Sequence, residues 1–132
     1  MIKNSLKRSE MLKSRKMIKT LFEEGSRIKN FPFTAFLLPI ESQKQSGPCL
    51  FMPIVSKRKF KRAVDRNRIK RLIKEVYRLN KGELYSYLTE NNKMCLLAVM
   101  YNGNEIPTFE IVQNKVNSLL KRVPEEYEKH IE

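Results

Sequence analysis

The sequence has few of the residues from which proteins build catalytic sites. Among its 132 residues there is one aspartate, Asp65, and one histidine, His130. A two-metal nuclease needs clustered carboxylates that hold two ions about 4 Å apart. A metal-independent nuclease needs a pair of histidines, or one histidine with a positioned partner. Neither arrangement is present, and the four glycines do not form a phosphate-binding loop. We therefore expect no catalytic residue and no firmly bound metal in this chain.

Cysteine and long apolar runs are also scarce. Cys49 and Cys95 lie in separate apolar segments, without a Cys-x-x-Cys motif or a neighbouring histidine. This favours two buried, reduced thiols, and a disulfide is the alternative if their strands are neighbours.

No run reaches the roughly 18 apolar residues of a membrane span, and residues 1–5 are not followed by the apolar region of a signal peptide. The sequence thus predicts a cytoplasmic protein without a membrane partner.

Acidic residues are outnumbered by basic ones, with 14 Asp and Glu against 27 Lys and Arg and a net charge of +13. Such an excess indicates a nucleic acid, an anionic membrane surface or an acidic protein as the partner. The segment from Ser56 to Lys74 has ten basic residues and one acidic residue, so it carries nine of these net charges. Its basic residues are Lys57, Arg58, Lys59, Lys61, Arg62, Arg66, Arg68, Lys70, Arg71 and Lys74.

The basic segment has the periodicity of a helix. Ile69, Leu72, Ile73 and Val76 are spaced i, i+3, i+4 and i+7, which predicts an apolar face packed on a core. Arginine on the opposite face favours phosphate as ligand, because the guanidinium fork matches phosphate geometry. A solvated face without a partner and a disordered basic tract fit less well, and a membrane-binding helix would carry apolar residues on its free edge. The opposite face carries Asn67, Arg68, Lys70, Arg71 and Lys74.

The rest of the chain predicts one small α+β domain over residues 14–123, with helices packed on a mixed sheet in the order α-β-β-α-β-α. Ser14 and Thr108 are expected to cap helices, and Gly25 and Pro124 to end them. Residues 1–13 are expected to form a flexible basic arm, and residues 124–132 a frayed acidic tail. The expected helices span residues 15–24, 56–79 and 108–123, with a further turn within 83–90, and the expected strands span 31–40, 49–55 and 94–100.

The run Arg66-Asn67-Arg68-Ile69-Lys70-Arg71-Leu72-Ile73 resembles the Arg-Asn-Arg signature of the family of bacterial ribonuclease P proteins. Ser56-Lys57-Arg58 resembles that family's Ser-Lys-Lys lead-in, and the resemblance extends from about residue 12 to 123. It implies a two-layer α-β sandwich similar to domain 2 of ribosomal protein S5. It also implies a left-handed crossover at the basic helix, where chain geometry alone favours a right-handed one.

The resemblance further implies a function. The chain would be a subunit of an endoribonuclease in which the RNA subunit carries the catalytic centre and holds most of the Mg²⁺. It would bind that RNA through the basic segment and the 5′ leader of precursor tRNA in a cleft, and would assist removal of the leader. No DNA partner is expected, and the alternative is a ribosomal-type RNA-binding protein without a role in nuclease activity. The implied RNA-binding residues are Arg62, Arg66, Asn67, Arg68, Lys70, Arg71 and Lys74 on the helix, and Lys57, Arg58, Lys59 and Lys61 in the lead-in.

Three positions of the family's helix and strand motifs, Ile18, Phe22 and Phe36, are the implied cleft residues. Aromatic side chains on a sheet can stack on bases of single-stranded RNA, while basic groups follow its backbone. The same side chains can equally be core residues. Among the phenylalanines of this region, the pattern favours the core for Phe31 and Phe33.

Overall fold

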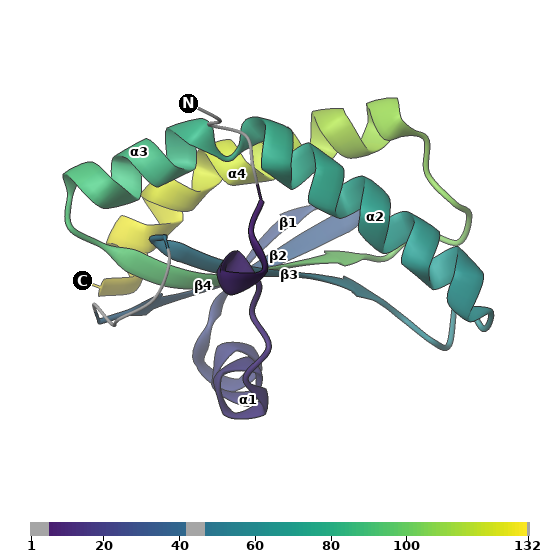
Figure 1. The fold of residues 1–132 in the computed structure, drawn as a ribbon, viewed down its shortest axis with the longest axis horizontal. Helices are drawn as coiled ribbons and strands as arrows, with labels where there is room; N and C mark the ends of the chain where they lie inside the picture. Colours follow the sequence, from purple (N-terminus) through teal and green to yellow (C-terminus); the bar gives the residue numbers. More distant parts are fainter. Residues whose placement is uncertain (1–5, 42–46, 132) are drawn as a thin grey trace.

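The structure, a computed structural model, describes residues 6–41 and 47–131. It has one four-stranded sheet with helices α2, α3 and α4 on one face and α1 on the other (Figure 1). This confirms the expected α+β fold with a small mixed sheet. The elements are the 3-10 turn η1 (Arg8–Glu10), helices α1 (Arg15–Glu24), α2 (Ala63–Asn80), α3 (Gly82–Glu90) and α4 (Phe109–Ile131), and strands β1 (Ser26–Asn30), β2 (Phe33–Ile40), β3 (Cys49–Val55) and β4 (Met94–Tyr101).

The strand order is β1-β2-β4-β3, with antiparallel pairs β1–β2 and β2–β4 and a parallel pair β3–β4. Because parallel neighbours need a crossover connection, the chain passes through α2 and α3 between β3 and β4. Strand β1 was not expected, since the sequence predicts a single strand beginning at residue 31. In β1 only Ile28 is buried, between the exposed Arg27 and Lys29, so this strand lacks an apolar run.

Side chains that alternate along the strands divide the interior into two apolar layers. Phe33, Leu37 and Phe51 point into the main core between the sheet and helices α2–α4. There Phe51 of β3 stacks on Tyr77 of α2, with ring centroids 3.8 Å apart. Residues of the opposite parity, such as Leu38 and Leu96, form a smaller cluster beneath α1. The two layers follow from the twofold side-chain period of a strand.

The ends of the helices agree only in part with the sequence. Ser14 Oγ accepts a hydrogen bond from Met17 N at 3.2 Å, and Thr108 Oγ1 accepts one from Ile111 N at 3.2 Å, so both predicted caps are confirmed. Gly25 follows α1 as expected, but with an extended backbone at φ −74°. A Cβ there would lie 2.4 Å from the carbonyl oxygen of Leu21. Close approach of the backbone therefore explains this glycine better than a left-handed turn.

The segment before α1 differs from the expected flexible arm. Leu12 is buried, and its N–H donates to Phe51 O at 2.8 Å. Glu10 is buried as well and pairs with Lys81 Nζ at 2.7 Å, while Tyr85 OH donates to the same carboxylate at 2.6 Å. Residues 6–13 thus pack against β3 and the junction of α2 and α3. Residues 1–5 of the predicted arm lie outside the described residues.

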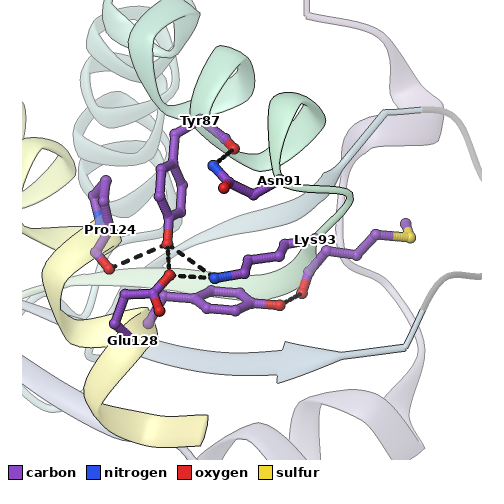
Figure 2. Close-up of polar contacts among 7 residues, drawn as sticks. Tyr87, Asn91, Lys93, Pro124 and Glu128 are labelled. Atoms are coloured by element: carbon purple, nitrogen blue, oxygen red, sulfur yellow. Dashed lines mark hydrogen bonds and ion pairs between the residues drawn. The ribbon is translucent and has the colours of Figure 1, made fainter.

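Helix α4 does not end at Pro124, and the prediction of a frayed tail from residue 124 is wrong up to Ile131. Proline removes one helical hydrogen bond, but tertiary contacts hold the turns that follow it. Tyr127 is buried, and its hydroxyl donates to Met94 O at 2.9 Å. Figure 2 shows Glu128 accepting from both Lys93 and Tyr87. His130, within the predicted frayed tail, has its Nδ1 2.7 Å from Ser26 Oγ.

Candidate nucleic-acid interface

The basic segment is a loop followed by a helix, whereas the sequence predicted a helix from Ser56 onward. Helix α2 begins at Ala63, and residues 56–62 form a compact lead-in loop. Ser56 Oγ accepts from Arg58 N at 3.1 Å, and Ser56 O accepts from Phe60 N at 3.1 Å. Phe60 is buried and packs on Tyr101 with ring centroids 6.1 Å apart. This anchor leaves Lys57, Arg58, Lys59 and Lys61 exposed.

The predicted apolar face of α2 is confirmed by burial. Ile69, Ile73 and Val76 are fully buried in the main core, and Leu72 packs at its edge. On the opposite side the charged groups remain accessible to a ligand. Arg62, Asn67, Arg68, Arg71 and Lys74 are exposed, and Lys70 is half-exposed.

Arg66 has a different environment from its neighbours. Its Nη1 donates to the carbonyl oxygens of Phe60 at 2.8 Å and Lys61 at 2.9 Å. The guanidinium therefore ties the end of the lead-in loop to the first turn of α2. The family signature implies that Arg66 binds RNA, but in this structure its hydrogen bonds stabilise the fold of the protein itself.

An open groove of about 710 Å³ runs along the start of α2. Three arginines, Arg62, Arg68 and Arg71, line it together with Asn67 and the single carboxylate of Asp65. Arg62 Nε lies 4.0 Å from Asp65 Oδ2, at the limit of an ion pair, and an exposed contact of this kind adds little free energy. The groove is therefore strongly positive and offers guanidinium forks suited to phosphate oxygens.

Further along α2, the charge of Glu75 is offset within the helix. Arg78 donates to both carboxylate oxygens of Glu75, at 3.1 and 2.7 Å. These hydrogen bonds hold the pKa of Glu75 below its ordinary value. The carboxylate that follows Lys74 in the sequence thus detracts little from the positive face.

The structure brings the three predicted cleft residues together in the cluster beneath α1. The rings of Phe22 and Phe36 meet edge to face, with centroids 4.8 Å apart, and Ile18 packs against the same cluster. The guanidinium of Arg27 lies 5.3 Å from the centroid of Phe36. Phe36 is only 5% exposed, whereas Ile18 and Phe22 are half-buried. A ligand on this side would therefore meet Phe22 and Ile18 before Phe36.

Other apolar residues on this side of the sheet were not identified from the sequence. Helix α1 packs on β2 and β4 and leaves Met52, Ile54 and Met100 half-buried beside it. The period-2 alternation of residues 49–55 was the signal that could have placed Met52 and Ile54 opposite the main core. Together with α1, these side chains form a shallow apolar surface across β3 and β4.

Of the two phenylalanines assigned to the core, Phe33 is confirmed and Phe31 is wrong. Phe33 is 1% exposed and contacts Tyr101, with ring centroids 5.1 Å apart. Phe31 is 78% exposed at the tip of the β1–β2 hairpin. The extended pattern of residues 31–40 conceals the turn, because the turn residues Phe31 and Pro32 are themselves apolar and continue into the apolar run of β2.

The two cysteines and the buried Glu10 have the environments of structural residues. The thiols of Cys49 and Cys95 are buried and unlinked, with Sγ atoms 3.6 Å apart on paired strands. Burial opposes ionisation of Glu10, but hydrogen bonds from Lys81, Tyr85 and Lys7 N outweigh it and lower the pKa of Glu10.

Within residues 6–41 and 47–131, no three His, Cys, Asp or Glu side chains are grouped as metal ligands. Nor does this part of the chain contain a helix of the length and apolarity that crossing a membrane requires.

Fold and surface together define a small α+β protein with a strongly basic helix face. The family model of ribonuclease P matches residues 6–124. The "Ribonuclease P protein component" of Porphyromonas gingivalis (strain ATCC 33277) is 35% identical over 118 residues, which cover 89% of this chain and 85% of that protein. The protein of the same name from Chlorobaculum tepidum is 33% identical, with 91% and 83% covered. The chain belongs to the ribonuclease P protein family.

Solved structures share this fold. The RNase P protein of Staphylococcus aureus superposes with a TM-score of 0.67 at 20% identity, covering 88% of this chain and 96% of that one. The RNase P protein of Thermotoga maritima superposes with a TM-score of 0.66 at 24% identity, covering 85% and 96%. The family that the Arg-Asn-Arg signature indicates is therefore confirmed by sequence, and its fold by structure.

Proposed function

We propose that this chain is the protein subunit of a ribonuclease P ribonucleoprotein and that it binds the catalytic RNA through the basic face of α2 and the lead-in loop. The observation that carries the proposal is the groove in which three arginines face one carboxylate. The residues that line this groove belong mainly to α2, and the opposite face of α2 is buried in the main core. Because the core fixes the backbone of this helix, only the arginine side chains need to be ordered when phosphates bind.

The second part of the proposal concerns the substrate. The apolar surface beside α1 is suited to the unpaired 5′ leader of precursor tRNA, because bases stack on accessible apolar and aromatic groups. Phe22 and Ile18 would provide the contact, and Phe36 would support them from beneath. Exposed Arg27 and Lys29 on β1 lie at the edge of the same sheet and could follow the leader's backbone.

In this proposal the RNA performs the endonucleolytic step that gives the mature 5′ end of tRNA. The Mg²⁺ ions of the holoenzyme are held mainly by that RNA, since this chain has a single aspartate, and that residue lies among arginines. The protein contributes positive charge between two polyanions and thereby lowers their mutual repulsion. Neither DNA nor a membrane is part of the proposal.

Reconstitution with the cognate ribonuclease P RNA tests it. Added protein should allow cleavage of precursor tRNA at low Mg²⁺, and Arg68→Ala should weaken this effect by roughly 10-fold through the loss of a phosphate contact. Lys121→Ala removes an equal charge from an exposed site on α4 and is the matched control. A protein that binds this RNA no better than unrelated RNA, and does not stimulate cleavage, would instead be of the ribosomal type.

The same assay tests the substrate surface. Phe22→Ala should weaken binding of precursor tRNA by the holoenzyme and leave mature tRNA, which has no leader, unaffected. An equal loss for both RNAs would show that the α1 surface does not bind the leader.

A further inference from the structure

The most exposed aromatic side chain lies away from both proposed surfaces. Phe31, 78% exposed, occupies the tip of the β1–β2 hairpin, where it has no place in either core. Scattered apolar residues on a surface need no explanation, but contiguous apolar patches often mark binding sites. Ile111 of α4, which is also exposed at 43%, faces the same depression.

Phe31 forms one side of an open groove of about 470 Å³. Its other lining residues include Pro32 beside it, and Ile106, Pro107 and Ile111 from the loop between β4 and α4 and the start of α4. Charged groups contribute one cation, Lys115, and one carboxylate, Glu105. The groove is thus bounded mostly by rings and aliphatic groups, with one charge of each sign.

This groove is connected to the basic lead-in loop through Asn102. The N–H of Asn102 donates to Pro32 O at 2.7 Å, and the side-chain amide of Asn102 donates to Thr34 Oγ1 at 3.0 Å. The carbonyl oxygen of Asn102 accepts from Lys59 Nζ. In Figure 1 the start of α2 and the loop between β4 and α4 lie at the same end of the molecule. An RNA strand bound at the lead-in loop would therefore pass next to the groove.

The composition of the groove favours a base over a phosphate group as its ligand. A phosphate inside it would meet mostly apolar walls, and the carboxylate of Glu105 offsets the charge of Lys115, so the groove offers an anion no net positive charge. A base is flat and uncharged, and it can stack on an aromatic ring whatever its sequence. Its backbone phosphates could then lie outside, near Lys59 and Lys115. Glu105 can accept a hydrogen bond from an exocyclic amino group, as carboxylates do from cytosine.

We propose that the groove between Phe31 and Ile111 holds one unpaired base of the RNA that occupies the basic face of α2, stacked on the ring of Phe31. This inference rests on the proposed function, since it extends the same RNA surface around the end of the sheet. The groove would add a stacking contact to an RNA surface that otherwise consists of basic side chains. Glu105 would add a preference for bases that carry an amino group.

The sequence offers a direct probe because it contains no tryptophan. In Phe31→Trp, the single indole should stack on the base, and its fluorescence should be quenched when the cognate ribonuclease P RNA is added. Phe109→Trp, at an exposed phenylalanine that does not line the groove, is the matched control and should show no such quenching. Phe31→Ala should bind this RNA about 10-fold more weakly, with an unchanged melting temperature.

Comparison with Arg68→Ala separates this inference from the proposed function. If Phe31→Ala binds the RNA like the unaltered protein while Arg68→Ala binds it more weakly, the base site is wrong and the function stands. If neither change affects binding, both proposals fail. If Phe31→Ala leaves RNA binding intact but abolishes self-association in sedimentation, the groove is instead a contact between two copies of the chain.

Discussion

At the scale of single residues, Arg66 and Arg68 show that two arginines of one motif can have different roles, one in the fold and one in binding. The sequence gives them equal weight, because both flank Asn67 in the family signature. In the structure Arg66 donates to two backbone carbonyls, whereas Arg68 lines the open groove. One arginine therefore shapes the surface, and the other is available to contact a ligand.

Replacing each arginine with alanine should separate these roles. Arg66→Ala loses two charge-assisted hydrogen bonds and should lower the free energy of unfolding by about 1–3 kcal/mol. Arg68→Ala, at an exposed position, should change it by less than about 0.5 kcal/mol. Urea unfolding of the two variants measures the difference. Equal stabilities would mean that the bonds to Phe60 and Lys61 contribute nothing to the fold.

The buried carboxylate of Glu10 predicts a dependence of stability on pH. Its pKa is lowered in the folded protein, so the unfolded chain binds the proton more readily. The stabilisation is therefore complete above the ordinary pKa of about 4.5 and is lost as the pH falls through the lower, folded value. The melting temperature measured from pH 7 to pH 3 should fall more steeply for the unaltered protein than for Glu10→Gln.

Glu90→Gln, which alters an exposed carboxylate at the end of α3, is the control for this measurement. It should follow the unaltered protein across the whole pH range. At pH 7, Glu10→Gln should itself be less stable, because Lys81 loses its buried carboxylate partner. Parallel pH curves for Glu10→Gln and the unaltered protein would contradict the assignment.

Which single residues could be predicted depended on how local their interactions are. Ser14 and Thr108 were identified as caps because each bonds a backbone N–H three residues away. Ile69 and Ile73 were placed correctly because helical periodicity is visible in the sequence. The role of Arg66 could not be read in this way, since it depends on how the lead-in loop folds back on α2. Phe31 was misassigned because its exposure depends on a turn that the apolar pattern conceals.

At the scale of elements, α4 shows how tertiary contacts override a local stop signal. Proline inside a helix costs roughly 3 kcal/mol, and the sequence therefore predicts an end at Pro124. The helix nevertheless continues, because Tyr127 is buried against β4 and Glu128 bonds Lys93 and Tyr87. Strand β1 is the converse case. Its sequence has no apolar run that predicts a strand, and its pairing with β2 holds it in the sheet.

Substitution of Tyr127 tests the contribution of the last turns of α4. Tyr127→Phe should cost about 1 kcal/mol through the hydrogen bond to Met94 O. Tyr127→Ala should cost about 3–5 kcal/mol through the cavity it leaves. Lys129→Ala alters an exposed side chain in the same turn and should have little effect. A frayed tail would make all three variants as stable as the unaltered protein in urea unfolding.

At the scale of the whole molecule, the positive charge is concentrated on one segment rather than spread evenly, and this predicts a strong dependence of RNA binding on salt. The logarithm of the affinity should fall linearly with the logarithm of the salt concentration, with a slope of about −0.7 to −0.9 for each phosphate neutralised. Arg68→Ala and Arg71→Ala should each reduce the slope by about 1. Lys121→Ala should leave it unchanged, and a flat titration for the unaltered protein would exclude this mode of binding.

The strand order also determines when the sheet can form. Strand β4 is the last strand along the chain, yet it lies at the centre of the sheet between β2 and β3. While the ribosome synthesises residues 56–93, the nascent chain already contains both neighbours of a strand that does not yet exist. At about 5–20 residues per second, this interval lasts roughly 2–8 seconds. Throughout it, the residues of β1, β2 and β3 are present without the central strand that pairs with β2 and β3, and a cationic helix is synthesised before the sheet that will support it.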